Sequence, residues 1–519
     1  MRKKKALTIV IAMMLLLGSM FMTACGSDSK NTTDNEENTL VYGSGDYSAI
    51  NPALFEHGEI NSLLFAGLTA HNEKNEVVPG LAESWEWNAD TKTYIFKLRD
   101  GVTFHDGEAL TADDVIFTLS VILEENNASE IISNYEDITD MSADDDRTVS
   151  ITLAENNVAF PDYMTVGILP EHMFDSTDIT ENEFNQNPVG AGPFKFSNWD
   201  MGQSITMEKF ADYYQGEPKL DKVVFKIVED YDQRALQLKS GDLDFAQITP
   251  KASEEIKGVD GLKVNIMSTA DYRGVMYNFN TEFWKENKEL IKAFSYAIDR
   301  ESIIESVLLG HGQVAYSPLQ KGDYNDPDVE KYEYNPIKAE TLIKKAGWVK
   351  GTKGVYEKDG KELEFVINNG QGDQVRIDMS NIAAQNLQDI GVNATVEVQA
   401  EVDWEKQDSY LIGWGSPFDP DDHTYKIFGT GQAANYSDYS NKKVDKFLTA
   451  GRQNEGKERR VEDYKEFQQE LAKDPAYTFI AYVDAVYAGK DNLSGITEDT
   501  ILGHHGVGVF WNIHQWEYK

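Results

Sequence analysis

Three carboxylates and an imidazole lie close together in the stretch "GWGSPFDPDDH", residues 413–423. Such side chains can bind a metal ion or exchange protons with a substrate. Their spacing favours a local role for the carboxylates. Asp419 suits the N-cap of a helix and Pro420 its first position. Asp421 and Asp422 then lie in the first turn, where the helix dipole favours acids. The stretch also lacks the spaced ligands and the glycine of a calcium loop, so we expect helix initiation and no resident metal.

The other side chains of this stretch are candidates for ligand binding. Trp414 and Phe418 offer flat apolar faces that suit the walls of a cleft. Asp419 and His423 are the further candidate contacts of this stretch. These four residues define the expected rim of a binding cleft.

No motif in the sequence pairs a nucleophile with a base or marks a resident cofactor. There is no His-Glu-x-x-His pattern, no Cys-x-x-Cys pair and no lysine-bearing phosphate loop. "GHHGVGVF", residues 503–510, is glycine-rich but lacks the strand-to-helix context of a dinucleotide site. Neighbouring residues on a strand point to opposite faces, so His504 and His505 are not expected to share a metal. We predict a protein that is not an enzyme and has no cofactor, with a surface or hinge-side role for this pair. His105 is expected to order its own turn.

The N-terminus has the layout of a secretory signal. Residues 2–5 are basic, and residues 6–20 form an apolar run that is short for a spanning helix. Residues 22–25, Met-Thr-Ala-Cys, resemble the lipobox of bacterial lipoproteins, whose cysteine receives a diacylglyceryl group. Cys25 is the only cysteine of the chain, so it cannot form an internal disulfide. We expect a signal peptide over residues 1–25 and a lipid on Cys25; an ordinary signal peptide is the alternative.

Charge and composition exclude several classes of protein. Residues 26–38 are polar and acidic and lack apolar anchors, which predicts a flexible tether. The formal net charge is −40, and loss of the four basic residues of the signal leaves about −44. Because nucleic-acid partners require basic faces, we expect no nucleic-acid binding. After the signal, no stretch approaches the roughly 18 apolar residues of a spanning helix.

The body alternates helix and strand patterns, which predicts α/β layers. Residues 93–104 alternate apolar and polar side chains, as a half-buried strand and its turn do. Thr111 is expected to cap a helix whose first turn holds Asp113 and Asp114.

Two later helices carry readable ends. Asp299 is expected to cap the second of two helices within residues 287–310. The helix that starts near Gln374 is expected to end with Gly391 at C′, where Val392 makes the accompanying apolar contact. A strand over residues 393–399 follows.

Residues 77–119 carry a resemblance to a known family. "PGLAESW", residues 79–85, and "LRDGVTFHDG", residues 98–107, match the signature region of extracellular solute-binding proteins that serve peptide and nickel ABC importers. Residues 89–91, Ala-Asp-Thr, stand where the family has a glycine turn. Six further stretches resemble the family in the same order: "NTLVYGSGDYSAINPAL", "NPVGAGPFKFSNWD", "DYYQGEPKLDKVVFKIVED", "ALQLKSGDLDFA", "VMYNFNTEFW" and "IKAFSYAIDRESII". The resemblance thus covers nearly the whole chain.

The resemblance implies an α/β fold of the periplasmic-binding-protein type. This is a two-lobe clamp of class II (cluster C) with an extra inserted domain and mixed sheets flanked by helices. Domain I is expected to be discontinuous, over residues 39–61, 186–269 and 488–519. Domain II, residues 62–185, is the insertion, and domain III covers residues 270–487. Two crossings between domains I and III form the hinge, and the ligand lies between the lobes.

Two loops are expected to face the ligand. The resemblance implies that the loop after the first strand touches it, which makes Asp46 and Tyr47 candidates; a plain turn is the alternative. The stretch "NNGQGDQ" follows a strand and precedes a helix, where α/β proteins place ligands. Asn369, Gln371 and Arg376 are the candidates there, against a capping or surface role.

The ligand stays open between two branches of the family. Dipeptide and oligopeptide receptors commonly carry Gly-Trp, two residues, and an aspartate that holds the α-ammonium group of the peptide. Here Pro417 occupies that position, and Asp419 could replace the aspartate. The string Trp-Gly-Ser-Pro-Phe-Asp-Pro resembles the nickel-receptor branch, but arginines for chelate carboxylates are not found at matching positions. We expect a peptide or a similar small solute, with a nickel or other metal chelate as the alternative.

The resemblance implies a receptor of an ABC importer, held outside the cell membrane by the lipid on Cys25. Its expected partners are a small solute, the permease and ATPase subunits of the importer, and the membrane; the receptor itself is expected to be a monomer. A closed, loaded clamp presents a different surface from an open one, so a permease can distinguish them. A surface peptide sensor or adhesin without transport is the alternative from another class.

Overall fold

The computed structural model describes residues 38–519 apart from residues 57 and 405. The expected signal peptide, the lipidation site Cys25 and the tether up to residue 37 lie outside the described residues. Within the described part of the chain, no helix has the length and apolar character needed to cross a membrane.

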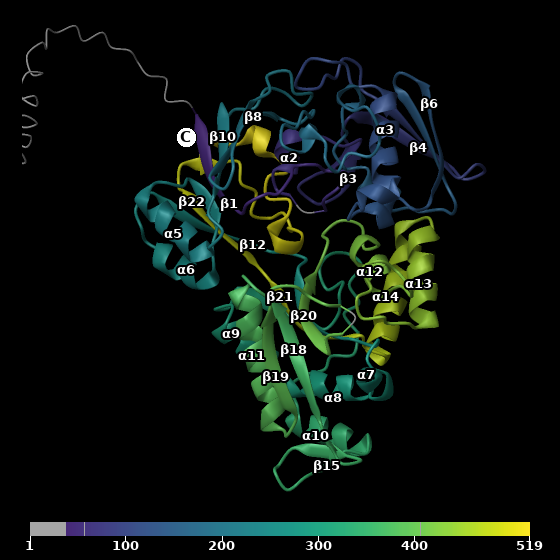
Figure 1. Cartoon of the computed structure of the whole chain (residues 1–519), viewed down its shortest axis with the longest axis vertical. Helices are drawn as coiled ribbons and strands as arrows, with labels where there is room; N and C mark the ends of the chain where they lie inside the picture. Colours follow the sequence, from purple (N-terminus) through teal and green to yellow (C-terminus); the bar gives the residue numbers. More distant parts are fainter. Residues whose placement is uncertain (1–37, 57, 405) are drawn as a thin grey trace, which may run out of the picture. The chain divides into compact units, whose positions relative to one another are not determined.

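A seven-stranded mixed sheet contains the first strand of the body (Figure 1). β1 (Thr39–Ser44) pairs in parallel with β10 (Lys222–Ile227) and β11 (Phe245–Gln247). Antiparallel pairs extend the sheet in both directions, in the order β12-β22-β11-β1-β10-β9-β8. The remaining strands are β8 (Phe194–Asp200), β9 (Ser204–Lys209), β12 (Leu262–Met267) and β22 (Ala485–Lys490). Strands from the start, the middle and the end of the chain therefore share one sheet.

A second, six-stranded sheet has the order β14-β21-β13-β20-β18-β19. Its two central strands β13 (Tyr272–Tyr277) and β20 (Ser409–Trp414) are buried along their whole length. Such runs are typical of strands that are covered on both faces. The other strands are β14 (Gly312–Val314), β18 (Glu364–Gly370), β19 (Asn393–Gln399) and β21 (Tyr477–Val483).

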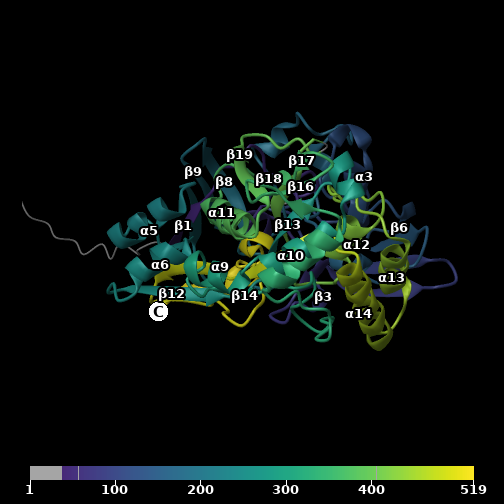
Figure 2. The same cartoon turned by 90° about the horizontal axis from the view of Figure 1, so that it is seen from below.

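Helices cover the six-stranded sheet. α8 (Leu290–Ala297) and α9 (Arg300–Ser306) pack on β21, and α11 (Gln374–Asp389) packs on β18 and β19. α10 (Pro336–Lys345) packs on α8. α13 (Lys442–Gln453) and α14 (Lys457–Lys473) lie side by side in both views (Figures 1 and 2).

The predicted ends of two of these helices are confirmed. The Asp299 carboxylate accepts the backbone N–H of Ser302 and caps α9. Gly391 has a φ of 98° after α11, where a side chain would be strained. The N–H of Val392 returns to the carbonyl of Leu387 at 3.0 Å, and its side chain is buried. This is the predicted glycine-terminated helix end.

A separate four-stranded sheet lies within residues 62–185 and has the order β4-β5-β7-β6. Its strands are β4 (Ala82–Asn88), β5 (Thr93–Leu98), β6 (Ile138–Asp145) and β7 (Thr148–Leu153). α3 (Ala112–Leu123) packs on this sheet. The Asp114 carboxylate accepts the backbone N–H of Thr111 at 2.8 Å, which confirms the predicted start of this helix.

The remaining helices and strands are mostly short, and the helices at residues 231–240 and 250–256 pack on the seven-stranded sheet. They are α2 (Asn61–Leu64), β2 (Thr69–His71), β3 (Val77–Pro79), α4 (Phe160–Tyr163), α5 (Tyr231–Ser240), α6 (Pro250–Ile256), α7 (Glu282–Glu286), β15 (Val349–Lys350), β16 (Tyr356–Lys358), β17 (Lys361–Glu362), α12 (Asp422–Phe428), β23 (Leu493–Ser494) and β24 (Glu517–Tyr518). Single turns of 3-10 helix include η5 (His504–Gly506).

Two large hydrophobic cores divide the described chain into two lobes. The first core takes its residues from between Leu40 and Met267 and from between Ala485 and Trp516. The second core takes its residues from between Tyr272 and Tyr482. We call residues 38–269 and 485–519 the first lobe and residues 270–484 the second lobe. Two lobes joined by two crossings form the clamp that was expected.

The first crossing between the lobes, at residues 269–270, is hydrogen-bonded to the C-terminal segment. Thr269 and Leu502 form a parallel bridge, and the N–H of Ala270 donates to the carbonyl of Leu502 at 2.8 Å. The division into three domains stays a prediction; β22 starts at Ala485, so the second crossing lies before the expected residue 488.

Candidate functional site

Asp419 binds an arginine of α14. The Arg460 guanidinium donates two bonds to the carboxylate, at 2.7 and 2.6 Å. α12 begins only at Asp422, so the predicted N-cap at Asp419 and the predicted first position at Pro420 were wrong. Burial raises the pKa of Asp419, and the bonds from Arg460 oppose that rise. Because Arg460 engages both oxygens, this carboxylate is poorly placed to hold a ligand ammonium group.

Asp421 lies at a junction between the lobes and is 1% exposed. Arg452 donates to it from Nε at 3.0 Å and from Nη2 at 2.9 Å. The Tyr163 hydroxyl of the first lobe donates to it at 2.6 Å. Arg452 also reaches Asp137 of the first lobe at 3.0 Å through Nη1. Helix initiation alone therefore does not explain this carboxylate, which belongs to an ion-pair network between the lobes.

Glu56, Asp422 and His423 form a cluster with the geometry of a metal site. The Lys426 ammonium already lies in this cluster, 2.6 Å from Glu56 and 3.3 Å from Asp422. His423 Nδ1 accepts the backbone N–H of Gly415 at 2.9 Å. Burial opposes the charge on Lys426, but the two carboxylates raise its pKa above the usual value. A fixed ammonium thus supplies the positive charge that a metal would bring.

The two aromatic residues of the stretch have different surroundings. Phe418 stacks on His71 of the first lobe, with ring centroids 3.7 Å apart and planes 7° apart. One face of Phe418 is therefore covered by protein. Trp414 ends β20, is 8% exposed, and lies 5.5 Å from His423 and 6.2 Å from His504 between ring centroids. Of these two aromatic residues, Trp414 is the one that lies next to the C-terminal histidine pair.

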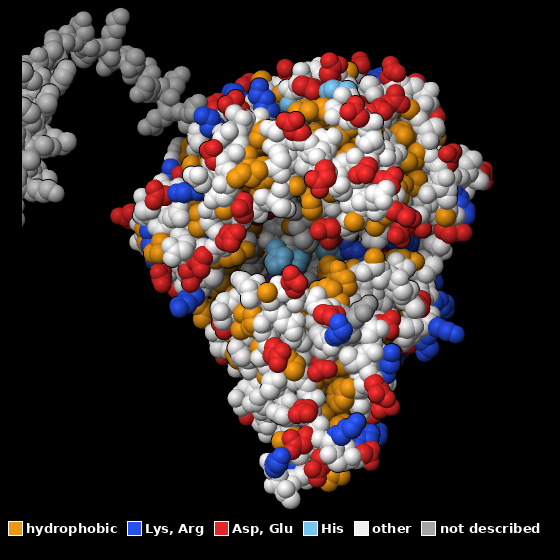
Figure 3. Space-filling model, viewed as in Figure 1, with side chains coloured by type: hydrophobic (Ala, Val, Ile, Leu, Met, Phe, Trp, Pro, Cys, Tyr) orange, Lys and Arg blue, Asp and Glu red, His pale blue; other side chains and the backbone are white. Residues whose placement is uncertain are grey.

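The histidine pair lies on a turn, not on a strand. His504 and His505 belong to η5, and their ring centroids are 3.9 Å apart. His505 has a φ of 56°, in the left-handed region that non-glycine residues rarely adopt. The prediction that His504 and His505 lie on a strand and point to opposite faces was therefore wrong. The predicted glycine-rich turn is present. Figure 3 shows histidine side chains in a hollow, where Figure 1 draws the C-terminal segment in yellow.

His505 faces Arg376 across this hollow. Arg376 Nη2 lies 3.3 Å from His505 Nε2, so the guanidinium donates and the ring nitrogen accepts. His505 is an exposed residue in the hollow, and the His504 ring lies against its ring. Partial desolvation by this packing, and then the nearby His504 and Arg273, lower the pKa of His505 below its usual value. The imidazole is then neutral at pH 7 and can act as a metal ligand.

α11 positions Arg376. Its N-cap Asp373 accepts the backbone N–H of Arg376 at 2.9 Å. The same carboxylate lies 3.0 Å from Nε of Arg376. One residue thus starts the helix and aims the guanidinium that the sequence had marked as a candidate.

Arg273 and Asp271 are residues that the sequence reasoning missed. Asp271 is 1% exposed and forms an ion pair with Arg273, which is 5% exposed. His504 Nδ1 lies 2.9 Å from the same Asp271 oxygen. Burial raises the pKa of Asp271. Arg273 and His504 lower it by more than that rise, so the pKa of this carboxyl group lies below its usual range. A Cβ on Gly413 would lie 1.7 Å from the Arg273 guanidinium, so the first glycine of "GWG" leaves room for it.

The other predicted contacts lie in varied places. Asn369 is fully buried, and its side-chain oxygen accepts the Ser380 hydroxyl at 3.0 Å. Gln371 is exposed beside it. Asp46 is exposed and caps the N–H of Tyr47, while Tyr47 is half-buried against the first core. A ligand role for these four residues stays a prediction.

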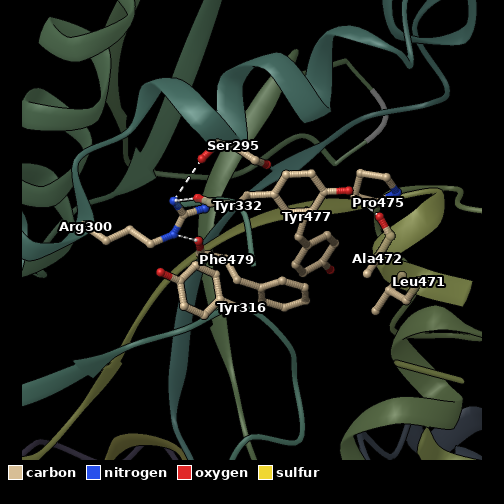
Figure 4. A pocket seen from close by; sticks show the side chains of 9 residues that line it. All are labelled: Ser295, Arg300, Tyr316, Tyr332, Leu471, Ala472, Pro475, Tyr477 and Phe479. Atoms are coloured by element: carbon tan, nitrogen blue, oxygen red, sulfur yellow. Dashed lines mark hydrogen bonds between the residues drawn. The ribbon is translucent and has the colours of Figure 1, made fainter. Parts of the chain in front are cut away.

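A small cavity lies deeper in the second lobe, around Arg300 (Figure 4). Its volume is about 10 Å³, which is room for one water molecule. Arg300 donates to the carbonyls of Phe479, Ser295 and Tyr332 at 2.7, 2.8 and 2.9 Å. Burial lowers the pKa of Arg300 to about 10. This arginine ties α9 to β21, and the cavity is too small for a solute.

Comparison with known proteins decides the family. The model of "Bacterial extracellular solute-binding proteins, family 5 Middle" matches residues 76–436. The chain belongs to this family. It is 32% identical to the oligopeptide-binding protein AppA of Bacillus subtilis over 99% of each chain. The solved structure of that AppA with a nonapeptide matches with a TM-score of 0.82 and 31% identity, over 93% of this chain and 99% of the other.

A second solved structure is similar and carries a different ligand. The structure of NikZ from Campylobacter jejuni in complex with Ni(L-His) matches with a TM-score of 0.87 and 35% identity. It covers 93% of this chain and 99% of the other. These matches confirm the two-lobe clamp and the family resemblance. The chain is a solute-binding protein of the ABC-importer class and not an enzyme.

Proposed function

We propose that the protein captures a small metal chelate with free carboxylates between its lobes and delivers it to the permease of an ABC importer. The observation that carries this proposal is the pair of Arg376 and His505, which face each other at 3.3 Å. A guanidinium binds a carboxylate, and a neutral imidazole binds a transition metal such as nickel. A metal carboxylate that enters between them replaces their direct bond: its carboxylate takes the Arg376 donor, and its metal takes the lone pair of His505 Nε2.

Three further features support this ligand over a peptide. Asp419, the candidate anchor for a peptide ammonium group, is engaged by Arg460. Trp414 offers an aromatic wall beside the histidine pair. The NikZ structure in complex with Ni(L-His) is similar to this chain over nearly its whole length. The metal is cargo in this proposal and not a resident cofactor.

The proposal includes the lipid anchor on Cys25. A diacyl group gives stable membrane attachment, whereas one chain would be marginal. A tethered receptor reaches the permease at high effective concentration. The lipobox-like residues 22–25 and the polar segment 26–38 support this layout.

The test uses NiCl₂ with two equivalents of L-histidine as the probe, titrated into the purified protein by calorimetry. We expect binding that His505→Gln weakens by roughly 10–100-fold. His172→Gln serves as the control, because His172 lies on the surface beside Asp106. If the probe does not bind, or binds His505→Gln as well as the original protein, the chelate proposal fails.

A peptide is the second candidate, because the similar protein AppA is named for oligopeptide binding. Native mass spectrometry of the purified protein, before and after denaturation, separates the two ligands. A retained peptide mass would support this second candidate and remove the first. A mass that contains nickel would do the reverse.

A further inference from the structure

The C-terminal histidine turn is bonded to the hinge and to the second lobe. The backbone N–H of His504 donates to the carbonyl of Gly415 at 2.9 Å. Leu502, two residues earlier, donates to the carbonyl of Ser268 at 2.9 Å. The turn is therefore held where the two lobes meet, although it follows β22 of the first lobe in sequence.

Asp271 is the side chain that fixes this turn. One carboxylate oxygen accepts Nδ1–H of His504 at 2.9 Å. The other accepts the backbone N–H of His505 at 3.2 Å. Its own backbone is held as well, because its N–H donates to Thr269 Oγ1 at 2.9 Å and its carbonyl accepts from Val483 at 3.0 Å. Both oxygens of a buried, rigidly held acid thus bind the histidine pair.

The backbone of the turn needs such support. His505 is in the left-handed region, with φ 56° and ψ 20°, a conformation that persists only where surrounding contacts impose it. The bond from its own N–H to Asp271 is one such contact. The next residue, Gly506, also has a positive φ, of 83°, and a Cβ there would lie 2.5 Å from the Tyr487 hydroxyl. The turn therefore aims the His505 ring at Arg376 only while these contacts persist.

We infer that Asp271 is a positioning residue for solute binding, which acts by holding His505 in the orientation that meets the metal of the bound chelate. This inference rests on the proposed function. Asp271 does not need to touch the solute. Outer groups that orient a metal-binding histidine typically change metal affinity by roughly 10–100-fold when they are removed.

Asp271→Asn is the direct variant, because an amide has one acceptor oxygen where three donors converge. We expect it to weaken binding of the nickel–histidine probe at least about tenfold. The same change should alter the visible absorption spectrum of the bound nickel. An unchanged affinity with an unchanged spectrum would overturn the inference.

A double-mutant cycle separates positioning from a general structural role. If Asp271 acts through His505, Asp271→Asn combined with His505→Gln should bind the probe no more weakly than His505→Gln alone. Fully additive losses would overturn the inference. If His505→Gln by itself has no effect, the chelate proposal has failed and the inference falls with it, which is a distinct outcome.

His504→Phe provides a second route if Asp271→Asn does not fold. This change removes the Nδ1–H donor and leaves the Asp271–Arg273 ion pair in place. We expect a partial loss of affinity and a changed spectrum with a near-normal melting temperature. Full affinity with the original spectrum in this variant would contradict the inference.

Discussion

At the scale of single residues, each aspartate of the "DPDD" segment has its own cation. Asp419 binds Arg460, Asp421 binds Arg452, and Asp422 binds Lys426. Removing one partner from such a buried pair leaves an uncompensated charge, which is costly. The segment therefore joins pieces of structure that are far apart in the chain, and it is not an open cluster that waits for a metal.

A neutral, half-buried histidine makes stability depend on pH. His105 Nδ1 accepts the N–H of Gly190 at 3.2 Å, and Nε2 lies 3.0 Å from the carbonyl of Gly192. Burial lowers the pKa of His105 to about 4, against about 6.5 when unfolded. The unfolded chain therefore binds more protons between these values, and the stability contribution of His105 is lost as the pH falls from 6.5 towards 4.

We predict that the free energy of unfolding falls by at most about 3 kcal/mol over this interval because of His105. Urea unfolding at pH 7.5, 5.5 and 4 measures it. His105→Gln keeps a donor and an acceptor but does not titrate, so its loss over the same interval should be smaller. Parallel pH curves for both proteins would refute the assignment. Both bonds of His105 go to residues 190–192, so the ring joins its turn to a distant segment, and the predicted role of ordering its own turn stays a prediction.

Sequence reasoning found some site residues and not others for a physical reason. Arg376 and Trp414 were found because each follows a local pattern, a strand-to-helix loop and a "GWG" string. Arg273 and Asp271 were missed because their meaning depends on His504, more than 200 residues away in sequence. The relative direction of the His504 and His505 side chains was predicted wrongly. The left-handed backbone at His505 brings the two adjacent rings together, which a strand would not do.

At the scale of elements, the start of α11 links helix stability to ligand binding. Asp373 accepts the N–H of Arg376 as N-cap and also pairs with its guanidinium. Two roles of one carboxylate can be separated, because serine can replace the cap but not the charge.

We predict that Asp373→Ala lowers the free energy of unfolding by about 1 kcal/mol through the lost cap. Asp373→Ser should recover most of that stability. Both variants should bind the nickel–histidine probe more weakly than the original protein, because Arg376 is no longer aimed. Thermal unfolding and calorimetry give the two readouts. Normal affinity in both variants would show that the ion pair does not orient Arg376.

Local signals predicted two helix starts and one C-terminal helix end correctly, and they predicted one other helix start wrongly. Thr111, Asp299 and Gly391 act within one turn of themselves, so their sequence context sufficed. Asp419 looked like the same kind of signal, and its carboxylate does accept the backbone N–H of Asp421 at 2.9 Å, but α12 begins only at Asp422. The carboxylate also binds Arg460 on a distant helix, a tertiary contact that the local pattern could not show.

At the scale of the whole described molecule, contacts between the lobes hold the clamp. Besides the Arg452–Asp137 pair, Val158 donates to the carbonyl of Arg452 at 2.9 Å. The side chain of Asn156 donates to the carbonyl of Gln453 at 2.7 Å. All these first-lobe residues lie within residues 62–185, so this segment supplies the first-lobe side of these contacts.

We predict that Asp137→Asn shifts the population towards the open clamp. The pair is partly exposed, so the expected effect is about 0.5–1 kcal/mol, or roughly a two- to fivefold change in population. Small-angle scattering should report a larger radius of gyration. Glu155→Gln is the control, because its pair with Lys92 lies within the first lobe. Equal radii for both variants would show that the Arg452–Asp137 pair does not affect closure.

The resemblance predicted the two-lobe architecture, because motifs from nearly the whole chain occur in family order. The contacts between the lobes could not be read in this way. Arg452 and Asp137 are both ordinary charged residues in sequence, and their pairing depends on how two separate cores come together.

The position of β22 has a consequence for the order in which the protein is made. β12 joins its sheet only through β22, and Trp516 fills the first core against Phe245, with ring centroids 5.3 Å apart. The second core is complete by Tyr482. During synthesis from the N-terminus, the second lobe can therefore finish folding while the first lobe still lacks a strand and part of its interior. The lobe that begins first on the ribosome is the last to mature.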